Sequence, residues 1–506
     1  MKSNMSDFDL LDDIYMDIDR NQPYTILDLP ARQLINSDRF DFFAILIYID
    51  HKVKGLDLTD ATKLYKERVA AQTDNKFVEI GKAETKNSFE KFIGALNTLI
   101  EDFKNGNFNN KQSLVPIDAN NFIIDGAHRV CCAAYFDKNI RVMKFTELIT
   151  NYRVDDKWLR NKDITQESLD KYALEYCKWR ENLYFFVLWP KSFANHKNHL
   201  RALEIIEKSN RIIHRKKIHL SFDATRNLMV QIYGHMDWVG SIDDNFEYTY
   251  AKAFDVHKDN APTEFILVEG GNLNFITQIK EQLRDVFKIS LNSVHSTDNS
   301  GETMQIAKLI YNKNSVHHLF NSSPFNFKTS YKLLETYKAA LLSHKENNDE
   351  FIVNGSFPMT MYGIRDASDL DFMTLTGKHT DLFFNFNKQI SNDEDEKKHY
   401  SINFKDILYN PRHYFVFNDL KFASLETIKQ FKSNRGESKD LNDVKLIDSF
   451  LQKKFAYRYF QMLNYYRKSR FTLYHGFWNT FYKITYLIPK PIYNSLRKRY
   501  RFIKKK

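Results

Sequence analysis

The sequence has few cysteines, glycines and prolines, and it contains no long apolar run. Its 506 residues include 3 Cys, 15 Gly and 10 Pro. Three cysteines cannot form a disulfide framework, and the adjacent pair Cys131 and Cys132 lacks metal-ligand spacing, so we expect a reducing compartment. The acidic N-terminus has no apolar signal region, and no run reaches the roughly 18 apolar residues that span a bilayer. These absences predict a cytoplasmic protein without collagen-like or loop-dominated segments.

Acidic residues are absent from the end of the chain. The net charge is +10, which by itself would indicate a polyanionic partner. However, no Asp or Glu follows Asp448, and residues 449–506 contain 15 Lys and Arg. Residues 1–448 therefore hold 59 basic and 64 acidic residues and carry a formal charge of −5. The basic character belongs to the tail, which argues against nucleic-acid binding by the body of the protein.

The composition predicts several domains with real hydrophobic cores. Apolar residues make up 43% of the chain and aromatic residues 15%, which excludes bulk disorder. Apolar spacing typical of helices alternates with short apolar strands, so we predict an α+β multidomain fold. Residues 314–328 are interpreted as a linker, and YFVFNDLKFASL as one strand. The predicted parts are an acidic, poorly ordered arm (1–30), a first unit (31–150), a helical connector (151–178), a second unit (179–315), a third unit (330–448) and a basic aromatic tail (449–506).

The third unit carries the clearest chemical motif, FIVNGSFPMTMYGIRDASDLDFMTL. Gly355 and Ser356 end one predicted strand, where a backbone turn and a hydroxyl can approach a phosphate. Asp369 and Asp371 alternate along the next predicted strand, so both carboxylates lie on the same side of the sheet. Paired carboxylates can hold Mg²⁺ against the phosphates of a nucleotide.

This motif resembles the nucleotidyltransferase superfamily, whose members have Gly-Ser, a short spacer and Asp-x-Asp. The resemblance covers about 110 residues and implies a nucleotidyltransferase fold, with Asp369 and Asp371 as metal ligands and Gly355 and Ser356 at the triphosphate. Active members also have a third carboxylate on a later strand, for which Asp406 and Asp419 are candidates without a clear placement. The segment RGESKDLNDVKLI resembles a helix start common in these domains; its matching residues are Lys439, Asp440 and Asp443.

The first unit contains NNFIIDGAHRVCCAA, which predicts a strand, an Asp-Gly turn and a helix. Backbone amides at such a helix start can bind an anion, and an arginine adds a fork-shaped phosphate ligand. The segment resembles the ParB-like superfamily, and its free-serine kinases match at Asp125, Gly126, His128 and Arg129. Ala127 stands where sulfiredoxins have their catalytic cysteine, so sulfinate repair is disfavoured. The alternative is a structural turn that caps a helix.

The kinase interpretation of the first unit also requires an upstream catalytic glutamate. Glu67 and Glu79 are the candidates that the sequence offers. The resemblance implies that this unit phosphorylates a small hydroxyl compound, such as a sugar or polyol.

The second unit contains an apolar strand ending at Pro190, a helix over 197–209, strands over 211–220 and 264–271, and NSVHSTDNSGE. This series resembles nucleoside diphosphate kinase, which implies a ferredoxin-like fold and a histidine that carries phosphate. The residues that match the phosphohistidine and its supporting side chains are His295, Asn292, Arg284, Tyr233 and Glu302.

Two departures from that family leave the chemistry of the second unit open. Trp189 stands where the family has a lysine before its proline. The segment between Gly271 and Arg284 is too short to supply the family's nucleotide-clamping residues. The alternatives are a degenerate nucleotide-binding platform and a surface histidine in a strand-to-loop turn.

The tail mixes basic and aromatic residues. Residues 450–502 contain 17 aromatics. This composition suits an anionic membrane surface, to which each Lys or Arg adds about 1 kcal/mol of attraction, and it also suits stacking on nucleic acid. A third alternative is that part of 449–486 packs on the third unit. We favour docking at the inner membrane surface.

Together the motifs predict a multidomain phosphotransferase and nucleotidyltransferase that uses Mg²⁺ and a nucleoside triphosphate. The expected acceptor is a small sugar or polyol, or its phosphate, for surface-polysaccharide synthesis. One alternative is a catalytically degenerate nucleotide-binding scaffold or sensor. Another is a nucleotidyltransferase that acts on RNA.

Overall fold

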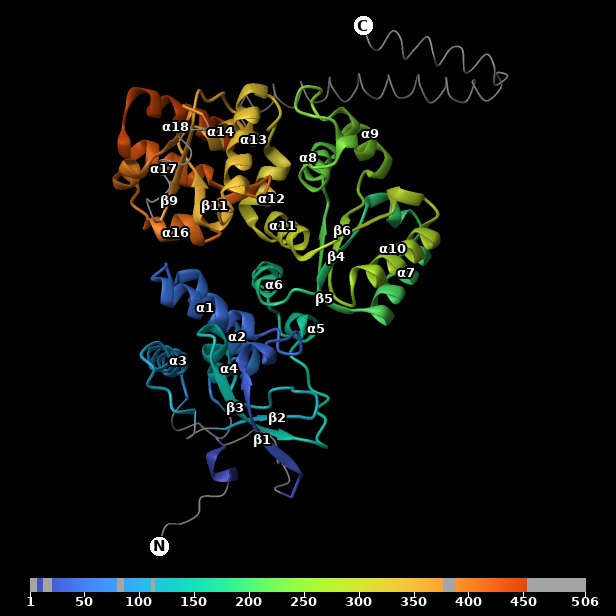
Figure 1. Ribbon diagram of the computed structural model, residues 1–506, viewed down its shortest axis with the longest axis vertical. Helices are drawn as coiled ribbons and strands as arrows, with labels where there is room; N and C mark the ends of the chain where they lie inside the picture. Colours follow the sequence, from blue (N-terminus) through green and yellow to red (C-terminus); the bar gives the residue numbers. More distant parts are fainter. Residues whose placement is uncertain (1–6, 12–20, 80–85, 111–113, 376–386, 453–506) are drawn as a thin grey trace, which may run out of the picture.

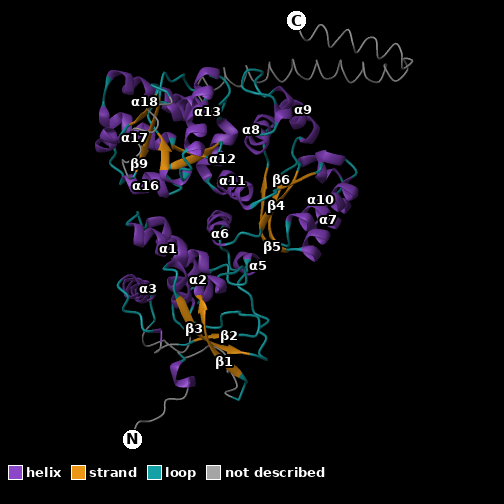
Figure 2. Cartoon of the chain, in the orientation of Figure 1, coloured by secondary structure: helices purple, strands orange, loops and turns teal. Residues whose placement is uncertain are grey.

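The described part of the chain has a mixed α/β structure with three separate small sheets (Figures 1 and 2). This computed structural model describes residues 7–11, 21–79, 86–110, 114–375 and 387–452. The mixed helix and strand content and the small sheets confirm the predicted α+β character at this coarse level. In the part of the chain that is described, no helix is both long and apolar enough to cross a membrane.

The N-terminal lobe, comprising the described residues of 7–150, has three helices above a small sheet, with α4 packed between them (Figure 1). Its sheet has the order β1-β3-β2, with β1 antiparallel and β2 parallel to β3. Its helices and strands are β1 (Tyr24–Pro30), α1 (Phe42–Lys54), α2 (Thr59–Gln72), α3 (Phe89–Lys104), β2 (Val115–Ile117), α4 (Ala127–Tyr135) and β3 (Asn139–Phe145).

Strand β1 corrects one sequence prediction, because we expected residues 1–30 to be a poorly ordered arm. Residues 24–30 instead pair with β3 along their whole length, from Tyr24 opposite Phe145 to Pro30 opposite Asn139. Tyr24 and Ile26 alternate along the strand and pack on a small apolar cluster that includes Phe145. The predicted strand before the Asp-Gly turn is reduced to a single bridge between Ile117 and Ile123.

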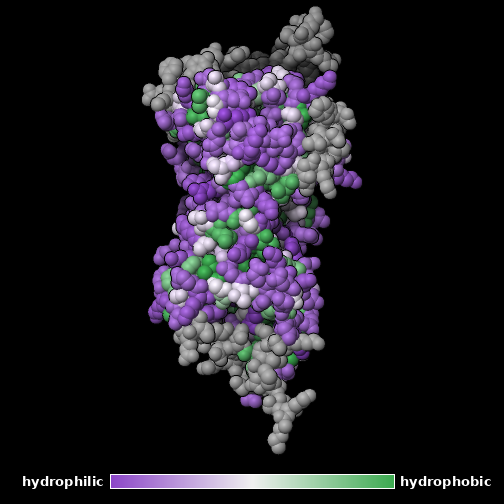
Figure 3. Space-filling model, turned by 90° about the vertical axis from the view of Figure 1, so that its left-hand side faces the viewer, coloured by the Kyte–Doolittle hydropathy of each residue, from purple (hydrophilic) through white to green (hydrophobic). Residues whose placement is uncertain are grey.

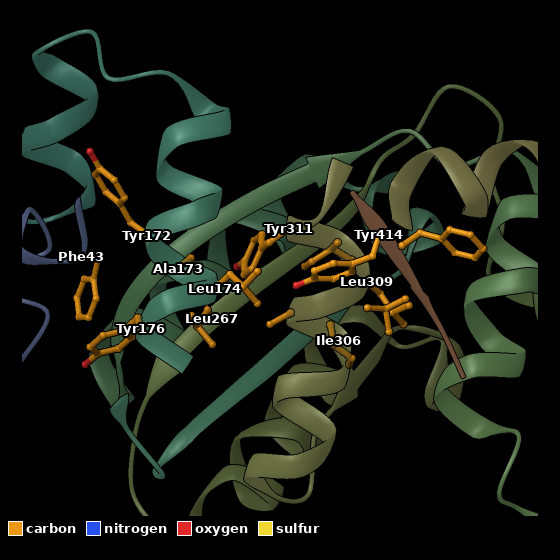
Figure 4. Packing of buried hydrophobic residues seen from close by; sticks show 14 of the residues in the cluster. Phe43, Tyr172, Ala173, Leu174, Tyr176, Leu267, Ile306, Leu309, Tyr311 and Tyr414 are labelled. Carbon is orange, nitrogen blue, oxygen red and sulfur yellow. The ribbon is translucent and has the colours of Figure 1, made fainter. Parts of the chain in front are cut away.

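Two helices follow this lobe within residues 151–179. They are α5 (Asp156–Asn161) and α6 (Gln166–Trp179), whose N-termini are capped by the side chains of Asp155 and Thr165. Helix α6 packs on α1 and on α11 (Ser300–Tyr311). Figure 4 shows Tyr176 of α6 beside Phe43, and Leu174 turned toward Tyr311. The connector is therefore part of the core.

The middle lobe, residues 183–296, is a four-stranded antiparallel sheet with the order β5-β6-β4-β7. Helices α7 and α10 cover one face of this sheet (Figure 1). Its helices and strands are β4 (Leu183–Leu188), α7 (His196–Ser209), β5 (Arg211–Ile218), α8 (Phe222–Tyr233), α9 (Glu247–Val256), β6 (Thr263–Glu269), α10 (Leu273–Phe287) and β7 (Val294–Ser296).

Strand β4 is buried on both faces, which explains its unbroken apolar sequence. Phe186 and Leu188 pack against the cluster beneath α7 and α10, whereas Phe185 and Val187 point into the large core shared with α6 and α11. The middle lobe is thus fixed to the other lobes through one face of its sheet.

The C-terminal lobe, comprising the described residues of 313–452, has a mixed sheet with the order β10-β9-β8-β12-β11. Strand β9 is antiparallel to β8 and parallel to β10. Its helices and strands are α12 (Lys313–Asn321), α13 (Lys328–Ser343), β8 (Phe351–Val353), α14 (Phe357–Tyr362), β9 (Leu370–Thr374), β10 (Ile390–Asn392), α16 (Phe404–Tyr409), β11 (Tyr414–Phe417), β12 (Leu420–Ala423), α17 (Leu425–Arg435) and α18 (Ser438–Leu451).

Two further sequence predictions are wrong in this lobe. The segment interpreted as a linker contains α12, which Asn312 caps by accepting hydrogen bonds from the backbone of Asn314 and Ser315. The segment YFVFNDLKFASL is a hairpin, because Asn418 and Asp419 both have positive φ and turn the chain back on itself.

A buried histidine ties the connector to the middle lobe. His214 of β5 is inaccessible to solvent, with Nδ1 2.6 Å from Asp156 of α5 and Nε2 2.9 Å from Asp170 of α6. Burial would lower the pKa of His214, but its hydrogen bonds to Asp156 and Asp170 outweigh burial and raise the pKa above 6.5. The two carboxylates therefore favour the protonated form of the imidazole.

We expect His214→Asn to reduce the free energy of unfolding by about 1–3 kcal/mol in mildly acidic buffer, because it removes a charged hydrogen bond from each carboxylate, while Arg160 still pairs with Asp156 and Lys216 with Asp170. Because the pKa of His214 is raised in the folded state, its protonation stabilises the protein, and this effect is complete below the unfolded-state pKa of 6.5. The stabilisation is lost as the pH rises through the folded-state pKa. Urea denaturation should show the difference between wild type and variant shrinking toward alkaline pH. The exposed His219→Asn is the control. A difference that grows with pH would contradict a protonated His214.

Candidate functional site

The Gly355-Ser356 turn lies against Asp371, as the sequence motif predicted. Gly355 follows β8 with a φ of +63°, a conformation that favours glycine. A Cβ atom at Gly355 would lie 2.6 Å from Oδ2 of Asp371. Glycine is therefore required both by the backbone and by the close approach of the carboxylate, and these two parts of the motif form one site.

Asp369 and Asp371 flank Leu370 at the start of β9, and they differ in burial. Asp369 is exposed, whereas Asp371 is half-buried and its Oδ1 accepts a hydrogen bond of 2.8 Å from Ser391. Burial raises the pKa of Asp371, and the nearby charge of Asp369 adds to that rise against the hydrogen bond from Ser391. The charge of Asp369 therefore disfavours the ionised form of Asp371.

A third carboxylate, which the sequence did not single out, joins this pair. Asp393 follows β10, and its Oδ2 accepts a hydrogen bond of 3.0 Å from the buried Asn354. Its backbone N–H donates to the carbonyl of Phe372, the residue after Asp371. Burial, followed by the charge of Asp371, raises the pKa of Asp393 to about 6. The parallel pairing of β10 with β9 brings it there.

The two carboxylates that the sequence offered for this role lie elsewhere. Asp406 is buried, and its Oδ1 accepts a hydrogen bond of 2.8 Å from the backbone of Asp57 in the N-terminal lobe. Asp419 lies in the turn between β11 and β12 and contacts Asn348. Neither contacts β9 or the Gly355-Ser356 turn.

Basic side chains from α17 face the carboxylates. Lys432 pairs with Asp440 at 3.2 Å and with Asp443 at 2.8 Å, and Arg435 pairs with Asp440 at 2.7 Å and with Glu396 at 3.0 Å. The charges of Lys432 and Arg435 act to lower the pKa of Asp371. The predicted residues Asp440 and Asp443 are thus buried partners that hold two cations next to the site.

Arg365 connects this ionic network to the turn. Its guanidinium binds both oxygens of Asp443, at 2.6 and 2.7 Å, and donates a 2.5 Å hydrogen bond to Oγ of Ser356. Lys439, which the sequence grouped with Asp440 and Asp443, points away and pairs with Glu437 at the surface. Arg365 lies in the loop before Asp369, a position for which we had no sequence prediction.

The donor set suits Mg²⁺. Asp369, Asp371 and Asp393 supply only carboxylate oxygens, and Mg²⁺ is commonly held by one or two carboxylates together with substrate phosphates. Among the described residues, no group of three or more His, Cys, Asp or Glu side chains lies close enough to hold a metal ion alone. Asp369 and Asp371 would therefore hold the ion only together with phosphate oxygens.

The middle lobe gathers residues around His295 of β7. Nε2 of this buried histidine is 3.0 Å from Oε1 of Glu302, and its ring meets Tyr233 edge-on at 5.2 Å. Burial would raise the pKa of Glu302, but its hydrogen bond with His295 and the charge of that imidazole outweigh burial and lower the pKa. The charges of Glu302 and Arg284 both influence the pKa of Tyr233, which burial raises. The structure thus brings these four residues together.

Asn292 and Trp189 occupy different positions around this site. Asn292 accepts a hydrogen bond of 2.7 Å from Lys252 of α9. Trp189 is fully buried and leads into the turn at Pro190. Its indole fills a core position and so offers no cationic group to a phosphate.

In the N-terminal lobe, α4 begins after Gly126, as predicted, and Gly126 has a φ of +90°. Nε2 of His128 lies 2.8 Å from the hydroxyl of Tyr65, and Arg129 is buried and donates to the carbonyl of Leu114. Asp125 lies 3.7 Å from the Arg129 guanidinium. The residues of the motif therefore lie next to one another, and their polar groups largely contact other residues of the protein. These residues are Asp125, Gly126, His128 and Arg129.

The glutamates proposed as partners for that motif are engaged elsewhere. Glu67 accepts a hydrogen bond of 2.6 Å from Ser168 of α6, and Glu79 pairs with Lys86 at 2.6 Å. Neither contact involves the Asp-Gly turn.

A cleft of about 1180 Å³ lies between the N-terminal lobe, α6, α11 and the C-terminal lobe, and none of the predicted site residues lines it. In the side view of Figure 3, apolar side chains gather at mid-height, where the lower part of the molecule meets the upper part. The charged groups in the cleft largely pair with one another, as Lys54 does with Asp50 and Lys178 with Glu175. We interpret the cleft as the boundary between lobes.

No protein-family model, no curated protein and no solved structure matches this chain.

We expect Asp393→Asn to increase the free energy of unfolding by about 1–2 kcal/mol at neutral pH, after allowance for solvent screening. A carboxyl whose folded-state pKa is raised from 3.8 to about 6 destabilises the protein progressively as the pH rises between those values. The asparagine stays neutral, so the gain should vanish below about pH 4. Urea denaturation at acidic and neutral pH measures it, with the exposed Asp395→Asn as the control. A destabilised Asp393→Asn at neutral pH would contradict the placement of this carboxylate.

Proposed function

We propose that this chain is an Mg²⁺-dependent nucleotidyltransferase whose active site lies in the C-terminal lobe. It transfers a nucleotidyl group from a nucleoside triphosphate to a small sugar or polyol, or to its phosphate, and releases pyrophosphate. The observation that carries the proposal is the contact between Gly355 and Asp371, with Asp393 beside them. Three residues far apart in sequence would not be brought together in this way by an ordinary surface turn.

The proposed roles of the site residues follow from their positions. Gly355 and Ser356 bind the triphosphate through the backbone and the hydroxyl, and Asp369 and Asp371 hold Mg²⁺. When bound, the ion neutralises charge on the phosphates and orients them. Lys432 and Arg435, held beside the site by Asp443 and Asp440, add positive charge near Asp371.

Asp393 is the proposed proton acceptor. With a pKa of about 6, its carboxylate is mostly ionised at neutral pH and still basic enough to take a proton. The acceptor hydroxyl loses its proton to Asp393, its oxygen forms a bond to the α-phosphorus, and the bond from that phosphorus to pyrophosphate breaks. Asn354, which donates to Asp393, would fix the orientation of the carboxylate.

The other lobes support the wider proposal to different degrees. The middle lobe has the element order β-α-β, two helices, then β-α-β, and its antiparallel strand order is that of a split β-α-β ferredoxin-like sheet. This order supports a nucleoside diphosphate kinase-like platform, with His295 as a phosphate carrier. The proposed kinase activity of the N-terminal lobe rests on its sequence motif, because His128 and Arg129 contact Tyr65 and Leu114.

The pyrophosphate assay tests the proposed function. We expect Asp371→Asn and Asp369→Asn to reduce pyrophosphate release from Mg²⁺, each labelled triphosphate and pooled sugar phosphates at least about 100-fold, because each removes a metal ligand. Asp419→Asn, which changes a carboxylate outside the site, should keep full activity. Equal release by Asp371→Asn and wild type would show that the site is wrong.

The same assay separates the alternatives. Nucleotide binding without consumption of any triphosphate would favour a scaffold or sensor. Pyrophosphate release that requires RNA as acceptor would favour the RNA-directed enzyme.

The basic aromatic tail lies outside the described residues, and we propose that it docks the enzyme on an anionic membrane surface. Deletion of residues 487–506 removes 8 of the 15 basic residues of the tail. We expect this deletion to abolish cosedimentation with anionic liposomes at moderate salt. Unchanged sedimentation would contradict membrane docking, and retention of RNA by the full-length chain would support the nucleic-acid alternative.

A further inference from the structure

Lys252 of α9 contacts the turn that precedes β7, the strand that carries His295, and no sequence motif indicated it. Its Nζ donates hydrogen bonds of 2.7 Å to the carbonyl of Leu291 and 2.7 Å to Oδ1 of Asn292. An ammonium group has three donors, so one N–H of Lys252 is left for a ligand. Burial lowers the pKa of Lys252 to about 8, and the nearby charge of Arg284 acts in the same direction, against that of Asp255.

Two more cations lie on one side of α10. Lys280 and Arg284 are four residues apart, a spacing that places them side by side and makes like charges repel. Lys280 is half-buried and makes no hydrogen bond or ion pair with any described residue. Burial lowers its pKa, with Asp298 opposing and Arg284 adding to the effect. Nε of Arg284 is buried without a hydrogen-bond partner, although Nη1 pairs with Glu281.

The acidic residues nearby do not neutralise these cations. Glu302 is half-buried, and it is already bound to His295 and to the backbone N–H of Asp298. Glu281, Asp255 and Asp298 are exposed, so solvent screens their charges. The three partly buried cations therefore have one half-buried carboxylate in their vicinity, and that carboxylate is otherwise engaged.

We propose that Lys252, Lys280 and Arg284 form a binding site for a phosphoryl anion beside His295. Lys252 approaches from α9 and the other two from α10, so that a phosphate between them would meet positive charge from two helices. The site provides in this chain the cationic groups that Trp189 and the short segment after Gly271 do not supply. It is independent of the nucleotidyltransferase site proposed for the C-terminal lobe.

The test measures binding of inorganic pyrophosphate to the full-length chain by calorimetry, with EDTA present to exclude metal-dependent binding. We expect Lys252→Met and Lys280→Met each to weaken binding about tenfold or more, as loss of a charged hydrogen bond does. Lys208→Met, which changes an exposed lysine on α7, should bind as wild type does. Because EDTA removes Mg²⁺, binding that Lys252→Met and Lys280→Met weaken is separate from metal-dependent binding at the C-terminal site.

A second measurement distinguishes loss of the binding site from misfolding of a variant. NMR of the side-chain carbons of ¹³C-labelled lysines in the unmodified chain should show Lys252 titrating near pH 8 and its pKa rising when pyrophosphate is added. Lys252→Arg keeps the charge and should retain most of the affinity. The proposal is overturned if wild type does not bind, if Lys252→Met and Lys280→Met bind as wild type does, or if pyrophosphate leaves the Lys252 pKa unchanged.

Discussion

The packing of α6 against α11 is the contact on which the arrangement of the lobes depends. Helix α6 comes from the connector and α11 follows the middle lobe, yet both contribute to one hydrophobic cluster that extends from Ala31 to Phe450. Figure 4 shows this contact from close by, with Phe43 on one side of it and Tyr414 of β11 on the other. A cluster that includes residues of every lobe makes their relative positions a property of the core rather than of flexible linkers.

Ionic groups supplement this core where the lobes meet. His214 joins β5 to Asp156 and Asp170 of the connector, and Asp349 of the C-terminal lobe binds Lys308 of α11. In these pairs the partner's opposite charge outweighs the cost of burying the ionised group. The raised pKa of His214 and the lowered pKa of Asp349 show this. Such groups specify how the lobes fit together. Their charges are already neutralised by other groups of the protein, so no bound ligand is required to neutralise them.

The sequence predicted those parts of the site whose position depends on local spacing. The contact between the Gly355 turn and Asp371 follows from two adjacent strands joined by a short segment, and the motif therefore located it. Asp393 could not be found this way, because β10 has only three residues and reaches the site by pairing with β9. Lys252 was missed for a similar reason, since α9 lies in an insertion between β5 and β6. The sequence did not predict strand β1 or helix α12, because β1 forms by pairing with the distant β3 and the start of α12 depends on a single Asn cap.

The direction of the pKa shifts separates two kinds of charged cluster in this chain. Asp440, like Asp349, has a lowered pKa because cations of the protein outweigh the cost of burial. Asp371 and Asp393 have raised pKa values, and Lys252 has a lowered one, so their charged forms are less stable in the folded chain than in water. Ionised at neutral pH, such groups destabilise the fold until an ion of opposite charge binds. A cation beside the carboxylates and an anion beside the lysines would each relieve that cost. The chain therefore retains uncompensated charge at two of the three places where its motifs predicted phosphate chemistry, as it also does at Lys421, whose pKa burial lowers to about 8.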